Sequence, residues 1–208
     1  MKILVLGAAG GVGRLVVKQA LAHGNKVTAF VRDSGNAFLD GATIVHGDVL
    51  DNQALSDALL GQDAVVYAIG VKSTGPTTLF SQSTRRLLAA MEQQQVKRLV
   101  CITGVGAGET KGHGGFLYDR FIFPLFTKNR YGDKELQEQL IRQSNLDWTI
   151  VRPAPFSEGK PSAPFQVLTE VGNAVLRKVS RAEVAAFVLE ELGTRKYLRK
   201  TLFIGHKN

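Results

Sequence analysis

Short runs of apolar residues alternate with amphipathic segments along most of the chain. Continuous apolar runs of this length, rich in Val, Ile and Leu, are typical of strands buried on both faces of a parallel sheet. The runs are Lys2–Leu6, Lys26–Val31, Asp63–Ile69, Lys97–Thr103 and Asp147–Val151. Shorter runs predict further strands at Thr43–Val45, Phe165–Leu168 and Thr201–Ile204.

The segments between these runs have the residue spacing of helices. Helices are predicted over Val12–Leu21, Asn52–Leu60, Thr78–Gln94, Asp133–Gln143 and, near the C-terminus, Ser180–Leu192. Asp51 can cap the second of them, and Ser180 followed by Glu183 is the pattern of a capping box. Strands and helices that alternate in this way form right-handed βαβ units. The sequence therefore predicts an α/β fold, a Rossmann-like doubly wound parallel sheet, with residues 1–208 in a single domain.

Two segments, 104–130 and 153–178, depart from this alternation and are predicted to lie on the substrate side. Both follow the carboxyl ends of predicted strands, where open α/β sheets bind ligands. The first segment is rich in aromatic residues. They are Phe116, Tyr118, Phe121, Phe123 and Phe126. These residues could form an apolar lid over a planar ligand, or equally a hydrophobic plug or a self-association patch.

Composition and charge limit the class of protein. The 208 residues include 26 Lys and Arg against 18 Asp and Glu, a net charge of +8, but the basic residues are dispersed and belong to no nucleic-acid-binding motif. A solvated basic surface is therefore favoured, and no nucleic acid partner is expected. With Cys101 as its single cysteine and no apolar run long enough to span a membrane, the protein is expected to be cytoplasmic. The four histidines lack metal-ligand spacing, so no metal is expected, and His113 is the one histidine to test in catalysis.

The glycine-rich sequence from Gly7 to Gly13 is the strongest chemical signal. It follows the first predicted strand, opens the first predicted helix and has the spacing G-x-x-G-x-x-G. Gly7 would allow a tight turn and Gly13 a close approach of the helix to the sheet, while Gly10 and Gly11 would let backbone amides approach a diphosphate. The helix amino terminus adds free N–H donors and a positive field. The motif predicts nucleotide binding, and the alternative is a glycine turn with a structural role alone.

Basic residues beside the second predicted strand favour NADP(H) over NAD(H). Arg32 follows that strand, near the position where NAD-selective sites usually carry a carboxylate for the ribose hydroxyl. Its planar donor group suits a 2′-phosphate, and Arg14 at the start of the first helix could stand beside it. Asp33 comes next in the chain and could supply the carboxylate of an NAD site, so NAD(H) remains the less favoured alternative cofactor.

Several motifs together resemble those of one known group of proteins. They are GAAGGVG, VRD, GDVLD, DAVVYAIG, VKRLVCITGVG, DKELQEQLIRQSNLDWTIVRPAPF and VSRAEVAAFVLEEL. The chain is similar to the atypical short-chain dehydrogenase/reductase group with its NmrA-like relatives, and among these to the biliverdin-IXβ reductase/flavin reductase type. The similarity runs from Lys2 to about Leu192 and is thinnest in 105–130 and 155–178. It is specific for the superfamily and much less so for a substrate.

The resemblance implies a set of residues that contact the cofactor, most of them just after predicted strands. In chain order the set is Gly7, Ala9, Gly10, Gly11 and Val12 at the pyrophosphate, Arg32 at the adenosine phosphate, Asp48 and Val49 at the adenine, Ala68, Ile69 and Gly70 at the ribose, Thr103 and Gly104 at the nicotinamide, and Pro153 at its amide. Gly13 and Arg14, from the glycine motif itself, complete the predicted cofactor site.

The family's catalytic residues are matched incompletely. Typical short-chain dehydrogenases use Tyr-x-x-x-Lys, in which the phenol transfers a proton, but here Lys134 follows Tyr131 one position too early. Helical spacing could still place both on one face, although a packed tyrosine and a ribose-binding lysine are the favoured alternative. The flavin reductase presents a serine after its fifth strand, where this chain has Gly104 preceded by Thr103. Thr103, Tyr131 and Lys134 are therefore the catalytic candidates.

An acceptor that takes hydride readily, and its proton from water, requires little from the protein beyond positioning. We therefore expect an NADPH-dependent reductase that acts on a flavin or a similar conjugated acceptor such as biliverdin or a quinone. The alternative is a non-catalytic NAD(P)-sensing NmrA-like regulator or assembly factor that acts through a protein partner. An isomerase or epimerase is disfavoured by the absence of Tyr-x-x-x-Lys. The expected partner is a small planar substrate such as a flavin or tetrapyrrole, and the expected state is a monomer or weak homo-oligomer.

Overall fold

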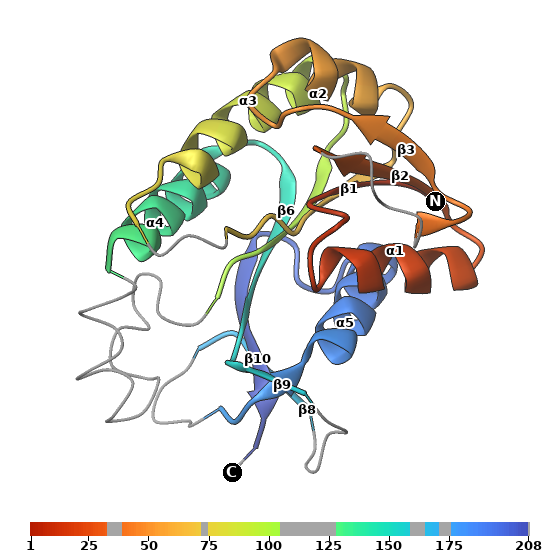
Figure 1. Ribbon diagram of the computed structural model, residues 1–208. Coiled ribbons are helices and arrows are strands. Elements are labelled where there is room, and N and C mark those ends of the chain that lie inside the picture. Colours follow the sequence, from red (N-terminus) through yellow and green to blue (C-terminus); the bar gives the residue numbers. More distant parts are fainter. Residues whose placement is uncertain (33–38, 72–74, 105–127, 159–164, 171–175, 208) are drawn as a thin grey trace.

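An eight-stranded sheet with helices on both faces forms the centre of the molecule (Figure 1). The computed structural model describes residues 1–32, 39–71, 75–104, 128–158, 165–170 and 176–207, and for residues 128–131 the backbone alone. The strands of this sheet are β1 (Lys2–Leu6), β2 (Lys26–Val31), β3 (Thr43–His46), β4 (Ala64–Tyr67), β5 (Arg98–Ile102), β6 (Asp147–Pro153), β8 (Phe165–Leu168) and β10 (Lys200–His206). A second, two-stranded sheet consists of β7 (Phe156–Ser157) and β9 (Val179–Ser180).

The order of strands across the large sheet is β3-β2-β1-β4-β5-β6-β10-β8, and all neighbours are parallel except β10 and β8. The chain builds outward from β1 to β3 and then crosses back to place β4 on the other side of β1. This reversal places the switch in strand order between β1 and β4, and the carboxyl ends of the strands at such a switch are where doubly wound sheets bind ligands. The Rossmann-like α/β fold is thus confirmed. The edge strand β8 has its predicted bounds, but its antiparallel direction was not predicted.

Helices cover the two faces of the sheet in separate layers. The helices of the described residues are α1 (Gly13–Ala22), α2 (Asn52–Leu59), α3 (Leu79–Gln93), α4 (Lys128–Gln143) and α5 (Arg181–Thr194). Helices α1 and α5 pack together on one face, and α2, α3 and α4 cover the other (Figure 1). Side chains alternate along each strand, so Ile3 and Val5 of β1 join the apolar core under α1 and α5, while Leu4 and Leu6 join the core on the opposite face.

Many predicted boundaries differ from the structure by one or two residues, and two differences bear on the site. Helix α4 begins at Lys128 rather than at the predicted Asp133. The prediction missed this start because the residues before Asp133 are mostly polar, include Gly132 and lack the apolar spacing of a helix. Strand β6 does not end at Val151 but continues through Pro153, which is paired in register with β10. A charged residue, Arg152, stands within this strand, and its side chain is buried against α4.

Capping side chains fix the starts of three helices. The Asp51 carboxylate accepts hydrogen bonds from the backbone N–H groups at the start of α2, as predicted. The capping box of α5, between Ser180 and Glu183, is also present. Helix α3 has no cap from its own N-cap residue, and Asp133 of α4 takes that role by accepting hydrogen bonds from the N–H groups of Phe80 and Ser81, at 2.9 and 3.2 Å. This contact holds the start of α3 against α4.

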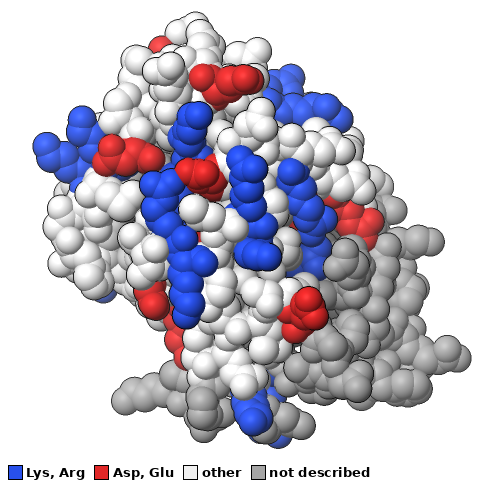
Figure 2. All heavy atoms as spheres, turned by 180° about the vertical axis from the view of Figure 1, so that it is seen from behind, with Lys and Arg blue, Asp and Glu red and all other residues white. Residues whose placement is uncertain are grey.

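Basic side chains gather along the middle of one face of the molecule, with acidic side chains standing among them (Figure 2). Among the described residues of this face, acidic side chains therefore interrupt the basic ones. No helix in the described parts of the chain has the length and apolar character needed to cross a membrane.

Candidate functional site: a glycine loop and a polar cluster at the carboxyl ends of the strands

The loop between β1 and α1 is held tightly by two of its glycines. Gly7 has a φ of +78°, and a Cβ atom added there would lie 2.7 Å from the carbonyl oxygen of Ala68, just after β4. A Cβ on Gly13 would lie 2.1 Å from the carbonyl oxygen of Gly7. A side chain at either position would force the loop away from β4 or the helix away from the loop. The tight turn and the close helix packing predicted for these glycines are both observed.

The amino end of α1 is open to an anion. Val12, the N-cap residue, provides no side-chain cap, and the first turn contains no acidic residue. Ala9, Gly10 and Gly11 are exposed, and within the described parts of the chain the N–H groups of Gly11 and Val12 donate to no protein acceptor. Free N–H donors at the positive end of a helix dipole are the usual protein site for a phosphate group.

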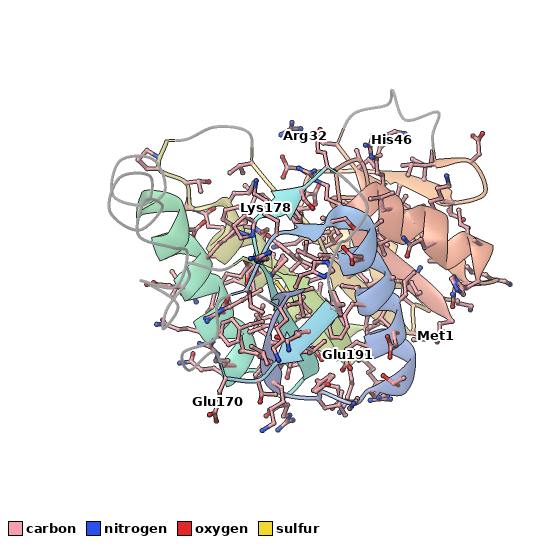
Figure 3. The ribbon with its side chains drawn as sticks, turned by 90° about the horizontal axis from the view of Figure 1, so that it is seen from below. Met1, Arg32, His46, Glu170, Lys178 and Glu191 are labelled. Carbon is pink, nitrogen blue, oxygen red and sulfur yellow. The ribbon has the colours of Figure 1, made fainter. Side chains whose placement is uncertain are left out.

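Arg32 lies beside this loop at the same edge of the sheet. It directly follows β2, which pairs in parallel with β1, so Arg32 lies beyond the carboxyl end of β2 as Gly7 does beyond β1. In Figure 3 Arg32 and His46, at the ends of β2 and β3, are close together and far from Met1, where β1 begins. The Arg32 and Arg14 side chains are exposed. The edge thus carries guanidinium groups beside the uncapped start of α1.

The remaining residues predicted for the cofactor occupy the same edge. Asp48 is exposed and accepts a hydrogen bond from the N–H of Leu50, at 2.8 Å, while Val49 packs against the core. The N–H of Ala68 donates to the carbonyl oxygen of Leu6, at 2.9 Å, which places the chain after β4 beside the glycine loop. Ile69 and Gly70 follow it, with Gly70 exposed.

Thr103, directly after β5, is joined to α4 by two hydrogen bonds. The Thr103 hydroxyl donates to Oε1 of Glu138, at 2.7 Å, and the Lys134 ammonium donates to the Thr103 carbonyl oxygen, at 2.8 Å. Gly104 follows with a φ of +154°, a conformation that favours glycine. The Thr103 N–H donates to Val151 of β6, and Pro153 is the last residue of that strand. The structure therefore brings Thr103, Lys134 and the end of β6 together.

Glu138 is the centre of a buried ionic cluster that the sequence analysis missed. Its carboxylate accepts two hydrogen bonds from Arg152, from Nε at 3.0 Å and from Nη2 at 2.5 Å, and a third from Arg142 at 2.9 Å. The side chains of Glu138 and Arg152 are each only 1% exposed. The Arg152 guanidinium also lies over the ring of Phe203, 5.2 Å from its centroid. The one signal in the sequence was the spacing of Glu138 and Arg142 on successive turns of a helix.

Some of the predicted residues cannot be compared with the structure. Tyr131 lies in α4 one turn before Lys134, but its side chain is not among those described. Asp33 and His113 lie outside the described residues, as do the aromatic residues of segment 104–130. That segment is described only at Gly104 and in the backbone of 128–130, and segment 153–178 only in part.

The switch in strand order, the tight glycine loop and the uncapped start of α1 define a dinucleotide-binding protein of the Rossmann type. The chain belongs to the NAD(P)H-binding family, which matches residues 7–195. Its placement with the short-chain dehydrogenase/reductase and NmrA-like proteins is thereby confirmed, and so is the expected NAD(P)H-binding class of the site.

One of the similar curated proteins is an assembly factor. The photosystem II assembly factor Ycf39 of Synechocystis is 29% identical over 214 residues, which cover 97% of this chain and 61% of that protein. This chain thus spans less than two thirds of that relative.

Solved structures match the whole fold. One, titled "An Anaerobillin Reductase from Escherichia coli O157:H7", has a TM-score of 0.79 and 20% identity, and covers 99% of this chain and 97% of its own. A short-chain dehydrogenase/reductase from Veillonella parvula, solved in complex with NADP, has a TM-score of 0.82 and 16% identity, with 99% and 94% covered. At these identities the likeness is one of fold.

Proposed function

We propose that the protein is an NADPH-dependent reductase that transfers hydride to a flavin or a similar conjugated acceptor such as biliverdin or a quinone. The observation that supports this most directly is the state of Thr103 and Lys134. The Thr103 hydroxyl proton is directed at the Glu138 carboxylate, and the Lys134 ammonium donates to a backbone carbonyl oxygen. In the described residues the Thr103 hydroxyl and one N–H of the Lys134 ammonium are thus engaged within the protein, which favours acceptors that take their proton from water.

The residues of the strand edge would hold the cofactor in this proposal. NADPH supplies the hydride when it is bound. The N–H groups of Gly11 and Val12 at the start of α1 bind its diphosphate, and Arg32 binds the 2′-phosphate. Thr103, which hydrogen-bonds to Glu138 and Lys134, would contact the nicotinamide from the end of β5. The protein's contribution is positioning, which is worth a large rate enhancement for a reactive acceptor.

The test is oxidation of NADPH by the purified protein, followed at the absorbance band of the reduced nicotinamide, with FMN, riboflavin, biliverdin and quinones as acceptors. We expect turnover with at least one of them, faster with NADPH than with NADH. Tyr131→Phe should retain turnover to within about threefold, because a single proton-transfer group contributes about 10²–10⁴-fold where it is needed. A fall of about a hundredfold in Tyr131→Phe would show that the phenol is the acid. No oxidation above background with any acceptor would refute the reductase.

A second candidate, an assembly factor or nucleotide-sensing regulator without turnover, is favoured by the similarity to Ycf39. Such a protein would bind NADPH and leave it unoxidised in the presence of every acceptor. The same experiment, combined with a binding titration, therefore separates the two candidates.

A further inference from the structure

A charged residue far from the glycine motif in sequence lies directly on the glycine loop. Arg181 is the first residue of α5, and α5 packs beside α1 (Figure 1). A Cβ atom added to Gly11 would lie 2.9 Å from Nε and 3.0 Å from Cδ of Arg181. The side chain of Arg181 thus fills the space that a side chain at position 11 would otherwise occupy. It reaches the part of the loop where the free N–H groups are.

The small sheet of β7 and β9 sets the direction of this side chain. Phe156 of β7 is paired in register with Val179 of β9, and Arg181 follows β9 directly. The Arg181 guanidinium stacks on the Phe156 ring, 4.7 Å from the ring centroid. The capping box of Ser180 and Glu183 fixes the backbone on either side of Arg181. The arginine is therefore held in place before any ligand arrives.

Arg181 has no acidic partner in the described parts of the chain. The nearest carboxylate in sequence, Glu183, accepts from the N–H of Ser180 and faces His206 at 2.9 Å instead. A half-buried guanidinium without a counter-charge, next to an uncapped helix start, has the chemistry of a phosphate ligand. The positive charges of Arg181 and of the α1 end repel each other, and an anion bound between them would attract both and offset this repulsion.

We infer that Arg181 is a binding residue for the cofactor's diphosphate, reaching it from α5 while the N–H groups of Gly11 and Val12 reach it from α1. The inference depends on the nucleotide site of the family and not on the proposed acceptor. The diphosphate is common to NADH and NADPH, so Arg181 contributes to the binding of both. Arg32 differs in this respect, since it is assigned to the 2′-phosphate that only NADPH carries.

The first test measures the dissociation constants of NADH and NADPH by titration calorimetry for wild type and Arg181→Ala. We expect both constants to rise by a similar factor of about 10–100, the range for charge-assisted hydrogen bonds. Arg181→Lys should recover part of the affinity, and raised salt should reduce the difference between wild type and variant. Arg85→Ala, which removes an exposed arginine from α3, is the matched control for loss of one positive charge. Thermal unfolding of each variant checks the fold.

The second test uses Gly11→Ala, whose new methyl group meets only the movable end of Arg181. The methyl group displaces the arginine, so Gly11→Ala should weaken the binding of both nucleotides in the wild-type background. In the Arg181→Ala background it should have little further effect on binding. The inference is overturned if folded Arg181→Ala binds both nucleotides as wild type does, or if it loses affinity for NADPH alone. Failure of wild type to bind either nucleotide would refute the site as a whole. Failure of hydride transfer with binding intact would refute only the proposed reductase.

Discussion

A single buried carboxylate organises the polar groups between β5, β6 and α4. Glu138 accepts a hydrogen bond from the Thr103 hydroxyl and neutralises Arg152, which is buried with it, and Arg142 completes the cluster at the surface. A buried guanidinium is tolerated only with such a partner, because removing one charge of a buried pair leaves the other without compensation. The position of Thr103 at the end of β5 therefore depends on the charge of Glu138.

We expect Glu138→Gln to lower the free energy of unfolding by about 3–5 kcal/mol, because the amide keeps the shape of the side chain but leaves Arg152 uncompensated. Urea unfolding measures this change. Glu92→Gln, at an exposed position of α3, is the control and should change stability by less than about 0.5 kcal/mol. Equal midpoints for Glu138→Gln and the control would show that the cluster contributes nothing to stability.

At the other end of the cofactor site, Arg32→Asp should affect the binding of NADPH and NADH differently. We expect the dissociation constant of NADPH to rise by about tenfold or more, through loss of a charge-assisted contact and repulsion of the 2′-phosphate. The constant of NADH should change little, since NADH carries a hydroxyl at that position. An equal loss of affinity for NADH and NADPH would show that Arg32 does not bind the 2′-phosphate.

At the scale of elements, helix α5 is fastened to the sheet at both ends. Its first turn carries the capping box and Arg181, and its last turn carries Glu191, which pairs with Arg98 of β5 at 2.9 Å. Burial lowers the pKa of the Arg98 guanidinium, and the charge of Glu191 acts in the opposite direction. With both ends fixed, α5 holds its first residues in one place over the glycine loop.

The amino-terminal attachment of α5 should depend on pH. Burial works to raise the pKa of Glu183, but hydrogen bonds from Ser180 and the contact with His206 outweigh it and lower the pKa below its ordinary value. A carboxyl group with a lowered pKa in the folded state stabilises the protein above the unfolded pKa, about 4.3, and this stabilisation is lost as the pH falls through the folded pKa.

Wild type should therefore be more stable than Glu183→Gln at neutral pH, by about 0.3–1 kcal/mol, because the glutamine keeps the capping box but not the charge at the helix start. The difference should shrink below about pH 4. Urea unfolding of both proteins between these pH values measures it. A difference that stays constant or grows on acidification would contradict the lowered pKa of Glu183.

At the scale of the whole molecule, the sequence predicted the alternating elements and the layer structure because local patterns determine them. Apolar runs such as Lys2–Leu6 and Lys26–Val31 were correct to the residue. What depends on pairing between distant segments could not be predicted. The antiparallel direction of β8 and the two-residue strands β7 and β9 have no local signature, since each exists only through its partner.

The residues of the candidate site also fall into those that local sequence predicts and those that depend on distant partners. The glycine loop could be found because turn, close approach and helix start all lie within Gly7–Gly13. Arg152 was taken to mark a strand end, because a charge in an apolar run signals solvent unless its partner is known, and the partner, Glu138, is on α4. Arg181 reaches the loop only through the packing of α5 beside α1. The roles of such residues can be recognised only once the structure shows which residues they contact.

The contact between Gly11 and Arg181 also has an evolutionary consequence. A side chain at position 11 would occupy the volume that the Arg181 side chain fills, so position 11 cannot enlarge while Arg181 stays as it is. A lineage that gained a bulky side chain on the loop would have to shorten or redirect the residue at the head of the last helix. We therefore expect substitutions at these two sites to depend on each other, although 170 positions separate them in the sequence.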